Sequence, residues 1–262
     1  MQRAVTEFVP KSAANLFFTM KYAPSRMPAR QKYRSAVENK HGIEIGGPSA
    51  LFRTVLPLYQ AAAGLDGVNF STDTVWEGSI EAGNNFHYYP KKSGRQFIAD
   101  ATDLSEIATG QYEFLLSSNC LEHVANSIKA LTEWKRVIKD DGFLVLVLPN
   151  KESNFDHRRP FTKFEHLVED FSNGVGEDDL THLDEILELH DLSMDPPAGD
   201  LAQFKERSLK NFQNRTLHQH VFDVPLMKEM LGHVGFEILD LTTTKTDFYA
   251  LAKKNPGGSA AE

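Results

Sequence analysis

A carboxylate and a glycine pair stand where a short apolar strand runs into a helix, in the segment GIEIGGPSA at residues 42–50. Glu44 supplies the carboxylate, and Gly46 and Gly47 form a turn in which no side chain keeps a ligand away from the backbone N–H groups. The following helix adds the unpaired N–H groups of its first turn. Because the acid suits a ligand with a cationic amino group, the segment predicts a cofactor loop.

The loop lacks the two common phosphate-binding patterns. A P-loop ends in Gly-Lys-Ser or Gly-Lys-Thr, and a dinucleotide fingerprint needs G-x-G-x-x-G. Here Gly47 is followed by Pro48, Ser49 and Ala50. A Gly-Gly turn between a strand and a helix can also be purely structural, so the cofactor must be identified from residues elsewhere in the chain.

Polar residues also follow three later apolar runs. Asn69 ends the run GVN, Asp100 and Ala101 follow FIA, and Ser117 and Ser118 follow FLL. In a parallel sheet the carboxyl ends of the strands share one edge, where ligands bind. We therefore expect these residues to lie near the glycine turn. The alternative for Asp100 is a cap on a following helix.

The candidate catalytic residues follow the fourth and fifth predicted strands. Asp156 and His157 combine a carboxylate with an imidazole, the pairing of a general base with the group that orients it. Neighbours on an extended chain point to opposite faces, so His123 or His220 is an equally plausible partner for Asp156. His123 can also be a structural histidine packed against the sheet.

Two arginines and a histidine are candidates for contact with an acceptor. Arg158 and Arg159 carry guanidinium groups, which bind carboxylate or phosphate in a bidentate manner and suit an anionic acceptor. The alternative is that they neutralise their surroundings, because residues 151–220 hold 15 acids and 8 bases. His220 is the third candidate.

The same region carries six of the ten histidines. His218 and His220 have the alternate spacing that places two imidazoles on one side of a strand, as some metal sites require. No closed zinc spacing is present, so the prediction is no metal, with these two histidines as the candidates if one binds. Oxygen-rich surroundings would then favour Mg²⁺ or Mn²⁺. Other possible ligands are His166, Glu169, His182, Glu185 and His190.

The elements that must position these residues alternate between strand and helix. Apolar, β-branched runs predict strands at 42–46, 67–71, 96–100, 112–117 and 142–148. Helical spacing predicts helices at 49–63 and 120–139 between them. Beyond Pro149 the alternation stops, and helices are predicted at 161–171 and 178–190. A helix at 223–234 and strands at 235–241 and 246–252 close the pattern.

This order predicts an α/β fold with a doubly wound, mostly parallel, seven-stranded Rossmann-like sheet and a mostly helical insertion after strand five. The predicted units are an N-terminal helical segment at 1–40, a cofactor-binding core at 41–150, a polar insertion that forms the acceptor site or a lid at 151–220, closing elements of the core at 221–253 and a disordered tail at 254–262.

Composition excludes several classes of function. The chain has 262 residues, of which 41% are hydrophobic and 24% charged, as in ordinary soluble proteins. A single cysteine cannot form an internal disulfide, and no apolar run reaches the roughly 20 residues of a membrane span, so we expect a cytoplasmic protein without a membrane partner. The net charge is −8, and no basic cluster is long enough to follow a phosphate backbone, which argues against nucleic acid.

Several of these motifs, in this order, resemble those of class I S-adenosylmethionine-dependent methyltransferases, and in particular the type 11 kind. Residues 44–47 are similar to the family's first motif, E/D-x-G-x-G, from which Pro48 departs. The segment SSNCLEH, with the helix and strand that follow it, resembles the fourth and fifth motifs. The resemblance spans about residues 42–150 and the closing strands.

The resemblance implies S-adenosylmethionine as the cofactor and assigns roles to residues at the strand ends. The cofactor loop would consist of Glu44, Gly46, Gly47 and Pro48. Asp100 and Ala101 would meet the adenine, and Ser117 and Ser118 the methionine end.

Two positions are less clear. Where the family usually has an acid that holds the ribose hydroxyls, this chain has Asn69, with Asp66, Asp73 and Glu77 as nearby alternatives. His123 falls where some relatives have an active-site histidine.

The leading hypothesis is a methyltransferase that acts on an oxygen or nitrogen of a small polar metabolite, such as a sugar derivative or an organic acid. Because the sulfonium is already reactive, the protein must chiefly align the acceptor, and a base is needed only if the acceptor starts protonated. One alternative is a metal-dependent hydrolase that uses the histidines of 151–220. Another is a non-catalytic S-adenosylmethionine-binding partner of a second protein.

Overall fold

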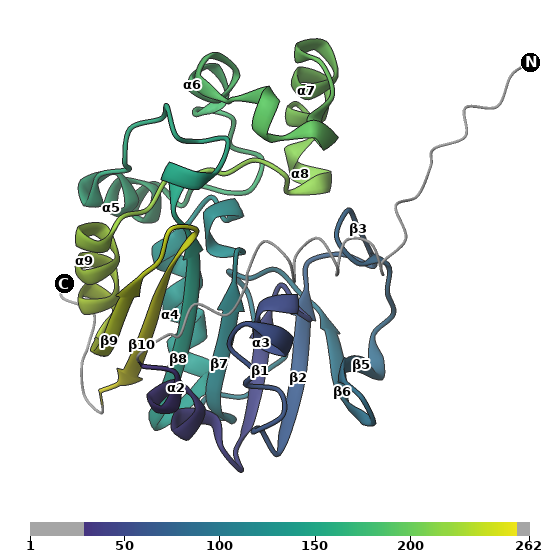
Figure 1. Ribbon diagram of the computed structural model, residues 1–262, viewed down its shortest axis with the longest axis vertical. Helices are drawn as coiled ribbons and strands as arrows, with labels where there is room; N and C mark the ends of the chain where they lie inside the picture. Colours follow the sequence, from purple (N-terminus) through teal and green to yellow (C-terminus); the bar gives the residue numbers. More distant parts are fainter. Residues whose placement is uncertain (1–28, 256–262) are drawn as a thin grey trace, which may run out of the picture.

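A single twisted sheet runs through the computed structural model, which describes residues 29–255 (Figure 1). Eight strands form the sheet in the order β5-β6-β2-β1-β7-β8-β10-β9. Their bounds are β1 His41–Ile45, β2 Gly64–Asn69, β5 Gly83–Tyr89, β6 Lys92–Ile98, β7 Tyr112–Ser118, β8 Ile138–Pro149, β9 Phe236–Thr243 and β10 Asp247–Lys254. A separate small hairpin consists of β3 Asp73–Thr74 and β4 Gly78–Ser79.

The central strands β6, β2, β1, β7 and β8 are parallel, whereas β5, β9 and β10 pair in the antiparallel sense. This arrangement confirms the predicted mostly parallel, doubly wound sheet, but it has eight strands rather than seven. The sequence pattern does not predict β5 because that edge strand, GNNFHYY, buries only Phe86 and Tyr88.

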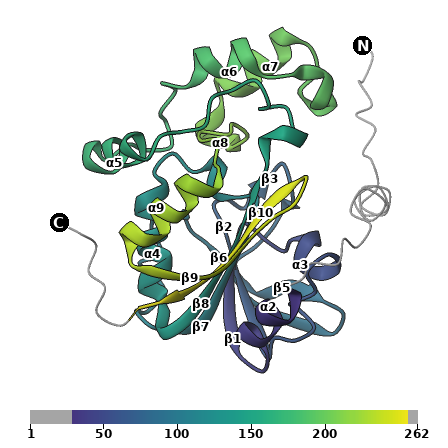
Figure 2. The ribbon, with the colours of Figure 1, turned by 60° about the vertical axis from the view of Figure 1, so that its left-hand side comes forward.

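Helices cover both faces of the sheet (Figure 2). The helices α2 Arg30–Val37 and α3 Ala50–Thr54 pack on one face, and α4 Ser127–Val137 and α9 Val224–Val234 pack on the other. Strand β8 is buried on both sides, since Leu144, Leu146 and Leu148 join one core and Val145 and Val147 the other. This explains its continuous apolar sequence.

Two predicted helices are shorter in the structure. The first ends at Thr54, because Pro57 has no N–H to donate and excludes helical geometry from the residue before it. The second is divided into a 3₁₀ turn, η1 Leu121–His123, and α4, which begins where the Asn126 side chain accepts from the Lys129 N–H. The break places Glu122 and His123 in a loop at the end of β7.

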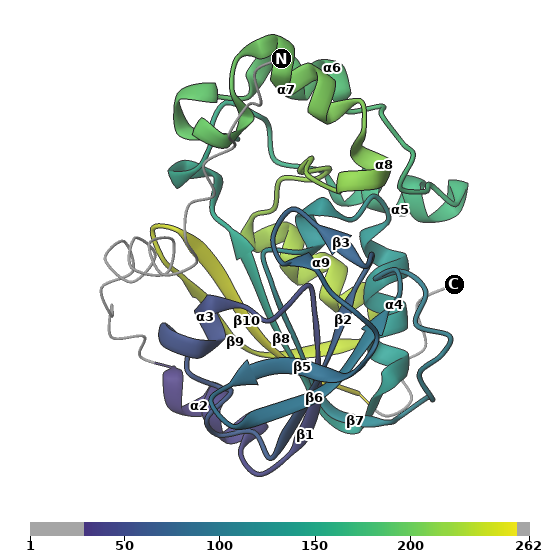
Figure 3. The same cartoon turned by 90° about the vertical axis from the view of Figure 1, so that its right-hand side faces the viewer.

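The insertion follows β8 and lies over the edge at which the parallel strands end (Figures 1 and 3). Its elements are η2 Lys151–Ser153, α5 Phe164–Asn173, α6 Leu183–Leu189, η3 Leu192–Met194, η4 Pro196–Ala198, α7 Leu201–Ser208 and α8 Asn211–Asn214. The predicted helices at 161–171 and 178–190 correspond to α5 and α6, while α7 and α8 were not predicted.

The insertion has a small core of its own, formed by Ile186, Ala198, Phe204 and Leu217. The predicted segment 1–40 is described only from residue 29 onward, and residues 256–262 of the predicted tail lie outside the described part. In that described part, every helix is too short or too polar to cross a bilayer.

Candidate active site

The glycine turn after β1 is closely packed. Gly46 has φ +79°, and its N–H donates to the Val68 carbonyl at 2.9 Å. A Cβ atom at Gly46 would lie 2.8 Å from the sulfur of Cys120, and one at Gly47 would lie 2.2 Å from the Glu44 carboxyl carbon. Both positions therefore require glycine, and the backbone of the turn remains as the surface that faces the strand ends.

Glu44 is fully buried beneath this turn. Its carboxylate accepts from the Ser49 N–H at 3.1 Å and from the Tyr59 hydroxyl at 2.7 Å. Burial is the main cause that raises the pKa of Glu44 to about 8. Glu44 thus connects β1 to the start of α3 by a hydrogen bond. Its contact with the amino group of a cofactor stays a prediction.

The neighbouring strands bring the other predicted cofactor residues to the same edge. Because β2 and β7 flank β1 in parallel register, Asn69, Ser117 and Ser118 end next to the turn. The Asn69 amide donates to the Gly47 carbonyl at 2.9 Å, so this side chain also holds the turn. All three side chains are buried. Of the acids considered instead of Asn69, Asp66 is occupied by the Tyr112 hydroxyl at 2.7 Å.

Asp100 lies two residues beyond β6 and connects the core to the insertion. One carboxylate oxygen accepts from the Thr102 N–H and hydroxyl, each at 2.8 Å, and the other pairs with Arg215 at 3.1 Å. Arg215 also pairs with Glu177 at 3.0 Å and lies 5.1 Å above the ring of Phe70. The alternative of a helix cap is wrong, because residues 101–111 form turns. The carbonyl of the adjoining Ala101 accepts from the Trp134 indole at 2.9 Å.

A polar cluster lies on the loop that continues from Ser117 and Ser118. Ligand-type atoms of Glu122, His123 and His218 lie within 4.8 Å of one another. Glu122 is 1% exposed, and its Oε2 atom has no hydrogen-bond partner among the described residues. Burial is the main cause that raises the pKa of Glu122 to about 7. A buried carboxylate oxygen without a hydrogen bond destabilises the folded protein unless a ligand donates a hydrogen bond to it.

His123 enters this cluster in a defined orientation. Its Nδ1 lies 3.0 Å from the Leu217 carbonyl, which can only accept, so Nδ1 carries the proton and Nε2 is the acceptor. Desolvation and the neighbouring His218 lower the pKa of His123 to about 3. The ring is therefore neutral, and its other edge contacts the half-exposed indole of Trp76 at a centroid distance of 5.2 Å.

Asp156 is paired with His218 rather than with His157. The Asp156 Oδ2 and His218 Nδ1 atoms are 2.5 Å apart, and Arg159 approaches the other carboxylate oxygen at 3.1 Å. Burial alone would raise the pKa of Asp156, but the charges of His218 and Arg159 outweigh burial and hold it at about 2. The predicted combination of a carboxylate and an imidazole thus exists with a different histidine.

His157, Arg158 and Arg159 are all bound to acids within the insertion. His157 and Arg158 share Asp191, at 2.9 and 2.8 Å. Arg159 is buried and binds Glu185 at 2.8 Å in addition to Asp156. Its guanidinium also donates to the carbonyls of His218 and Gln219, at 2.7 and 3.3 Å. These contacts position the segment that carries His218.

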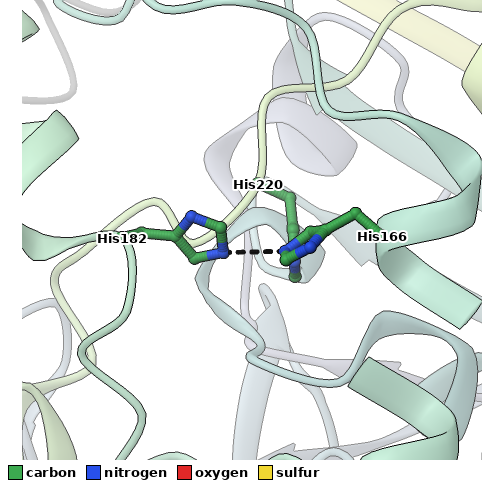
Figure 4. Close-up of side chains that lie close together, drawn as sticks. All are labelled: His166, His182 and His220. Atoms are coloured by element: carbon green, nitrogen blue, oxygen red, sulfur yellow. Dashed lines mark hydrogen bonds between the residues drawn. The ribbon is translucent and has the colours of Figure 1, made fainter. Parts of the chain in front are cut away.

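His218 and His220 do not lie on one side of a strand as their spacing predicts. Residues 218–222 have no regular secondary structure, so the two rings turn in different directions. His218 joins Asp156 and His123, whereas His220 joins His166, His182 and Asp170 (Figure 4).

Several functional candidates were missed at the level of sequence. Glu122 is visible in the motif LEH, but nothing in the sequence shows that it is buried without a partner. Tyr59 and Arg215 are distant in sequence from the groups that they bind. His218 was predicted only as a candidate metal ligand, from the His-Gln-His segment, and its pairing with Asp156 could not be deduced.

The strand-end residues fit S-adenosylmethionine. Gly46 is exposed at the glycine turn, and a Cβ atom at Gly46 or Gly47 would clash with Cys120 or Glu44. Buried polar groups of Asn69, Ser117 and Ser118 surround the turn, and the carboxylate of Asp100 stands at the far side of β2. This set combines small backbone-exposing residues with hydrogen-bonding groups, as a polar nucleoside cofactor requires.

Comparisons with known proteins bear on the fold and on the central part of the chain. Residues 55–146 match the family model described as a methyltransferase domain. No curated protein matches the sequence. Among solved structures, a methyltransferase candidate from Bacillus halodurans is 11% identical, with 88% of this chain and 100% of the other covered and a TM-score of 0.50. An S-adenosylmethionine-dependent methyltransferase from Mesorhizobium loti is 13% identical, with 87% and 96% covered and a TM-score of 0.50.

At these identities, the structural similarity concerns the fold, and the family model concerns the central strands and helices. Residues 55–146 thus match a methyltransferase domain, and the described residues share their fold with a solved S-adenosylmethionine-dependent methyltransferase, which supports the predicted class I family.

Proposed function

We propose that the enzyme methylates an oxygen or nitrogen atom of a small polar metabolite, such as a sugar derivative or an organic acid, bound at Glu122, His123 and His218. The observation that carries this proposal is the buried carboxylate oxygen of Glu122, which has no hydrogen-bond partner among the described residues. An acceptor with an O–H or N–H group would satisfy it. The cluster stands on the loop that directly follows the proposed cofactor residues Ser117 and Ser118.

Glu122 is the proposed general base. Its pKa of about 7 lies near the pH of the cell interior, which is where a base combines a useful deprotonated fraction with a useful driving force. The bound cofactor supplies an activated methyl group, so the protein must align the acceptor atom and remove its proton. Glu122 would accept that proton as the bond to the methyl group forms.

His123 and His218 are proposed to orient the acceptor. The neutral His123 ring presents Nε2 as a hydrogen-bond acceptor, because Nδ1 is held by the Leu217 carbonyl. His218 is fixed by Asp156, which in turn is held by Arg159. A rigid set of donors and acceptors of this kind selects a polar acceptor and lowers the entropic cost of alignment.

Arg158 and Arg159 do not suit the role that their sequence predicted, which is to bind an anionic group of the acceptor directly. Each is already paired with carboxylates of the insertion. An organic acid would therefore be recognised through its hydroxyl or amino group at the cluster. This point favours hydroxylated or aminated acceptors over simple carboxylates.

The test combines binding with turnover. Calorimetric titration with S-adenosylhomocysteine should show binding to the wild type and to the Glu122→Gln variant, with affinities that agree within about twofold because Glu122 lies outside the cofactor loop. Release of S-adenosylhomocysteine from S-adenosylmethionine is then measured with panels of hydroxy acids, amino acids, sugar acids and amino sugars.

For any acceptor found, Glu122→Gln should reduce kcat by about 10²–10⁴-fold, the usual contribution of a general base. Glu188→Gln, at an exposed position on α6, is the matched control and should retain full activity. No binding of S-adenosylhomocysteine by the wild type contradicts the cofactor assignment, and full activity of Glu122→Gln contradicts the base assignment.

A further inference from the structure

Three histidines from separate parts of the chain place ring nitrogen atoms within 4.8 Å of one another (Figure 4), and the carboxylate of Asp170 lies beside two of them. His166 and Asp170 are one turn apart on α5, His182 immediately precedes α6, and His220 lies in the segment that returns from the insertion to α9. This cluster is distinct from the proposed acceptor site, and the function proposed above makes no use of it.

The distances between the converging atoms match those of metal ligands. The Nε2 atoms of His166 and His182 are 3.0 Å apart. Asp170 Oδ2 lies 3.3 Å from the His166 Nε2 atom and 3.0 Å from that of His220. In a tetrahedral site with bonds of about 2.0–2.1 Å, neighbouring ligand atoms are about 3.3 Å apart. Three imidazole nitrogen atoms within 4.8 Å of one another, with a carboxylate oxygen beside two of them, are close enough to be drawn around one ion.

The His220 ring and the backbone of Asp170 are both held by residues at the start of α4. His220 places its Nδ1 atom 3.3 Å from the Ser127 hydroxyl at the start of α4. The Asn126 side chain, which also caps α4, donates to the backbone carbonyl of Asp170 at 3.0 Å. Partners of this kind fix the ring orientation and leave the opposite nitrogen directed at the ion.

We propose that His166, His182, His220 and Asp170 form a binding site for a zinc-like divalent transition metal ion. Three imidazoles and one carboxylate favour Zn²⁺ over Mg²⁺ or Mn²⁺, which prefer all-oxygen surroundings. Four protein ligands fill a tetrahedral shell, so the ion has a structural role. His166, with a side chain that is 33% exposed, marks the side from which the ion enters.

Such an ion would fasten the insertion to the core. Its ligands come from α5, from the start of α6 and from the returning segment, and two of them contact the first turn of α4. The insertion has little apolar core of its own, so a metal would replace hydrophobic burial as the source of its order. It would also hold residues 218–220, and hence His218, in place.

The first measurement is the binding of Zn²⁺ alone to full-length, metal-stripped protein, by competition with a chromophoric chelator. We expect one ion per chain, bound with submicromolar affinity, and a rise in Tm when Zn²⁺ is added. Cobalt in its place should show the strong visible absorption of four-coordinate Co²⁺. A wild-type protein that takes up no stoichiometric ion, or one whose Tm does not respond, overturns the proposal.

Variants then locate the ion. His182→Ala and Asp170→Asn should each lower the affinity for Zn²⁺ by at least about tenfold, the lower end of the effect of altering a metal's surroundings. His233→Ala, on α9, should leave it unchanged, and so should His218→Ala, which belongs to the other histidine cluster. Circular dichroism confirms that each variant is folded, and the Co²⁺ spectrum of Asp170→Asn gives a second readout. Loss of the ion in His218→Ala but not in His182→Ala would place it in the acceptor site and contradict the assignment.

Discussion

The edge of the sheet that carries the predicted cofactor residues and the insertion above it hold their polar residues in different ways. At the edge, polar groups sit at the ends of strands whose positions are set by two large apolar cores. In the insertion, a four-residue apolar cluster is supplemented by buried ion pairs and histidine contacts. The sheet can therefore carry buried acids, such as the hydrogen-bonded Glu44 and the partly unpartnered Glu122, at the cost of some stability. The insertion instead depends on its polar pairs for its own shape.

The largest predicted effect is the dependence of the free energy of unfolding on pH that Glu44 causes, and it tests this contrast. Its pKa in the folded state, about 8, is higher than the ordinary value, so folding favours the protonated form. The resulting stability is fully present below about pH 4.5 and is lost as pH rises toward 8, by at most about 4 kcal/mol. Urea unfolding, monitored by circular dichroism from pH 5 to pH 9, measures how the free energy of unfolding falls as pH rises.

Glu44→Gln is the matched variant for that measurement, because the neutral amide cannot ionise. The variant should have a flatter stability profile over the same range, while Tyr59 still finds an acceptor. The titratable groups nearest Glu44 are Tyr59, Glu77 and Arg53, of which the tyrosine pKa is raised well above the range of the experiment. Equal slopes for wild type and variant would show that Glu44 is ionised in the folded protein.

The second prediction tests the dependence of the insertion on its ion pairs. Asp156→Ala removes the buried partner of both His218 and Arg159. Breaking a buried pair in this way should cost about 3 kcal/mol, and Glu185, which keeps its contact with Arg159, limits the loss. Limited proteolysis should then cut the insertion before the core, while affinity for S-adenosylhomocysteine changes little.

Asp191→Ala is the control for that change, since Asp191 pairs with Arg158 and His157 near the surface of the same insertion. It should cause a clearly smaller loss of stability, because Arg158 and His157 are more exposed than Arg159 and His218, so water can replace their lost partner at lower cost. If the two variants are equally stable, the insertion is held by its apolar contacts and the proposed contrast with the sheet is wrong.

The smallest expected effect lies at the contact between the two regions. Arg215 pairs with Asp100, the residue proposed to meet the adenine. If the cofactor competes for that carboxylate, Arg215→Ala should tighten binding of S-adenosylhomocysteine by up to about fivefold, as the loss of a pair worth up to about 1 kcal/mol allows. Calorimetry measures this, with Arg207→Ala as the control. Weaker binding would instead show that Arg215 is part of the cofactor site.

The sequence alone was sufficient for the class of fold and for the expectation that the predicted cofactor residues share one edge of the sheet. This is because hydrophobic periodicity and glycine turns are local signals: β1, β7, β8 and the turn at Gly46 and Gly47 need no knowledge of distant residues. The same local pattern underestimates elements that bury little, which is why β5, α7 and α8 were not predicted.

Only the tertiary structure decided which polar groups meet. Asp156 was recognised as a candidate, yet its partner, His218, is 62 residues away, and the adjacent His157 turns to Asp191. His218 and His220 enter separate clusters because their segment is not a strand. Packing between segments far apart in the chain buries Glu122, which raises its pKa, and it also brings His166 and His220 to Asp170. Residue types set the chemistry that is available, whereas the fold sets the distances, desolvation and partners that determine its use.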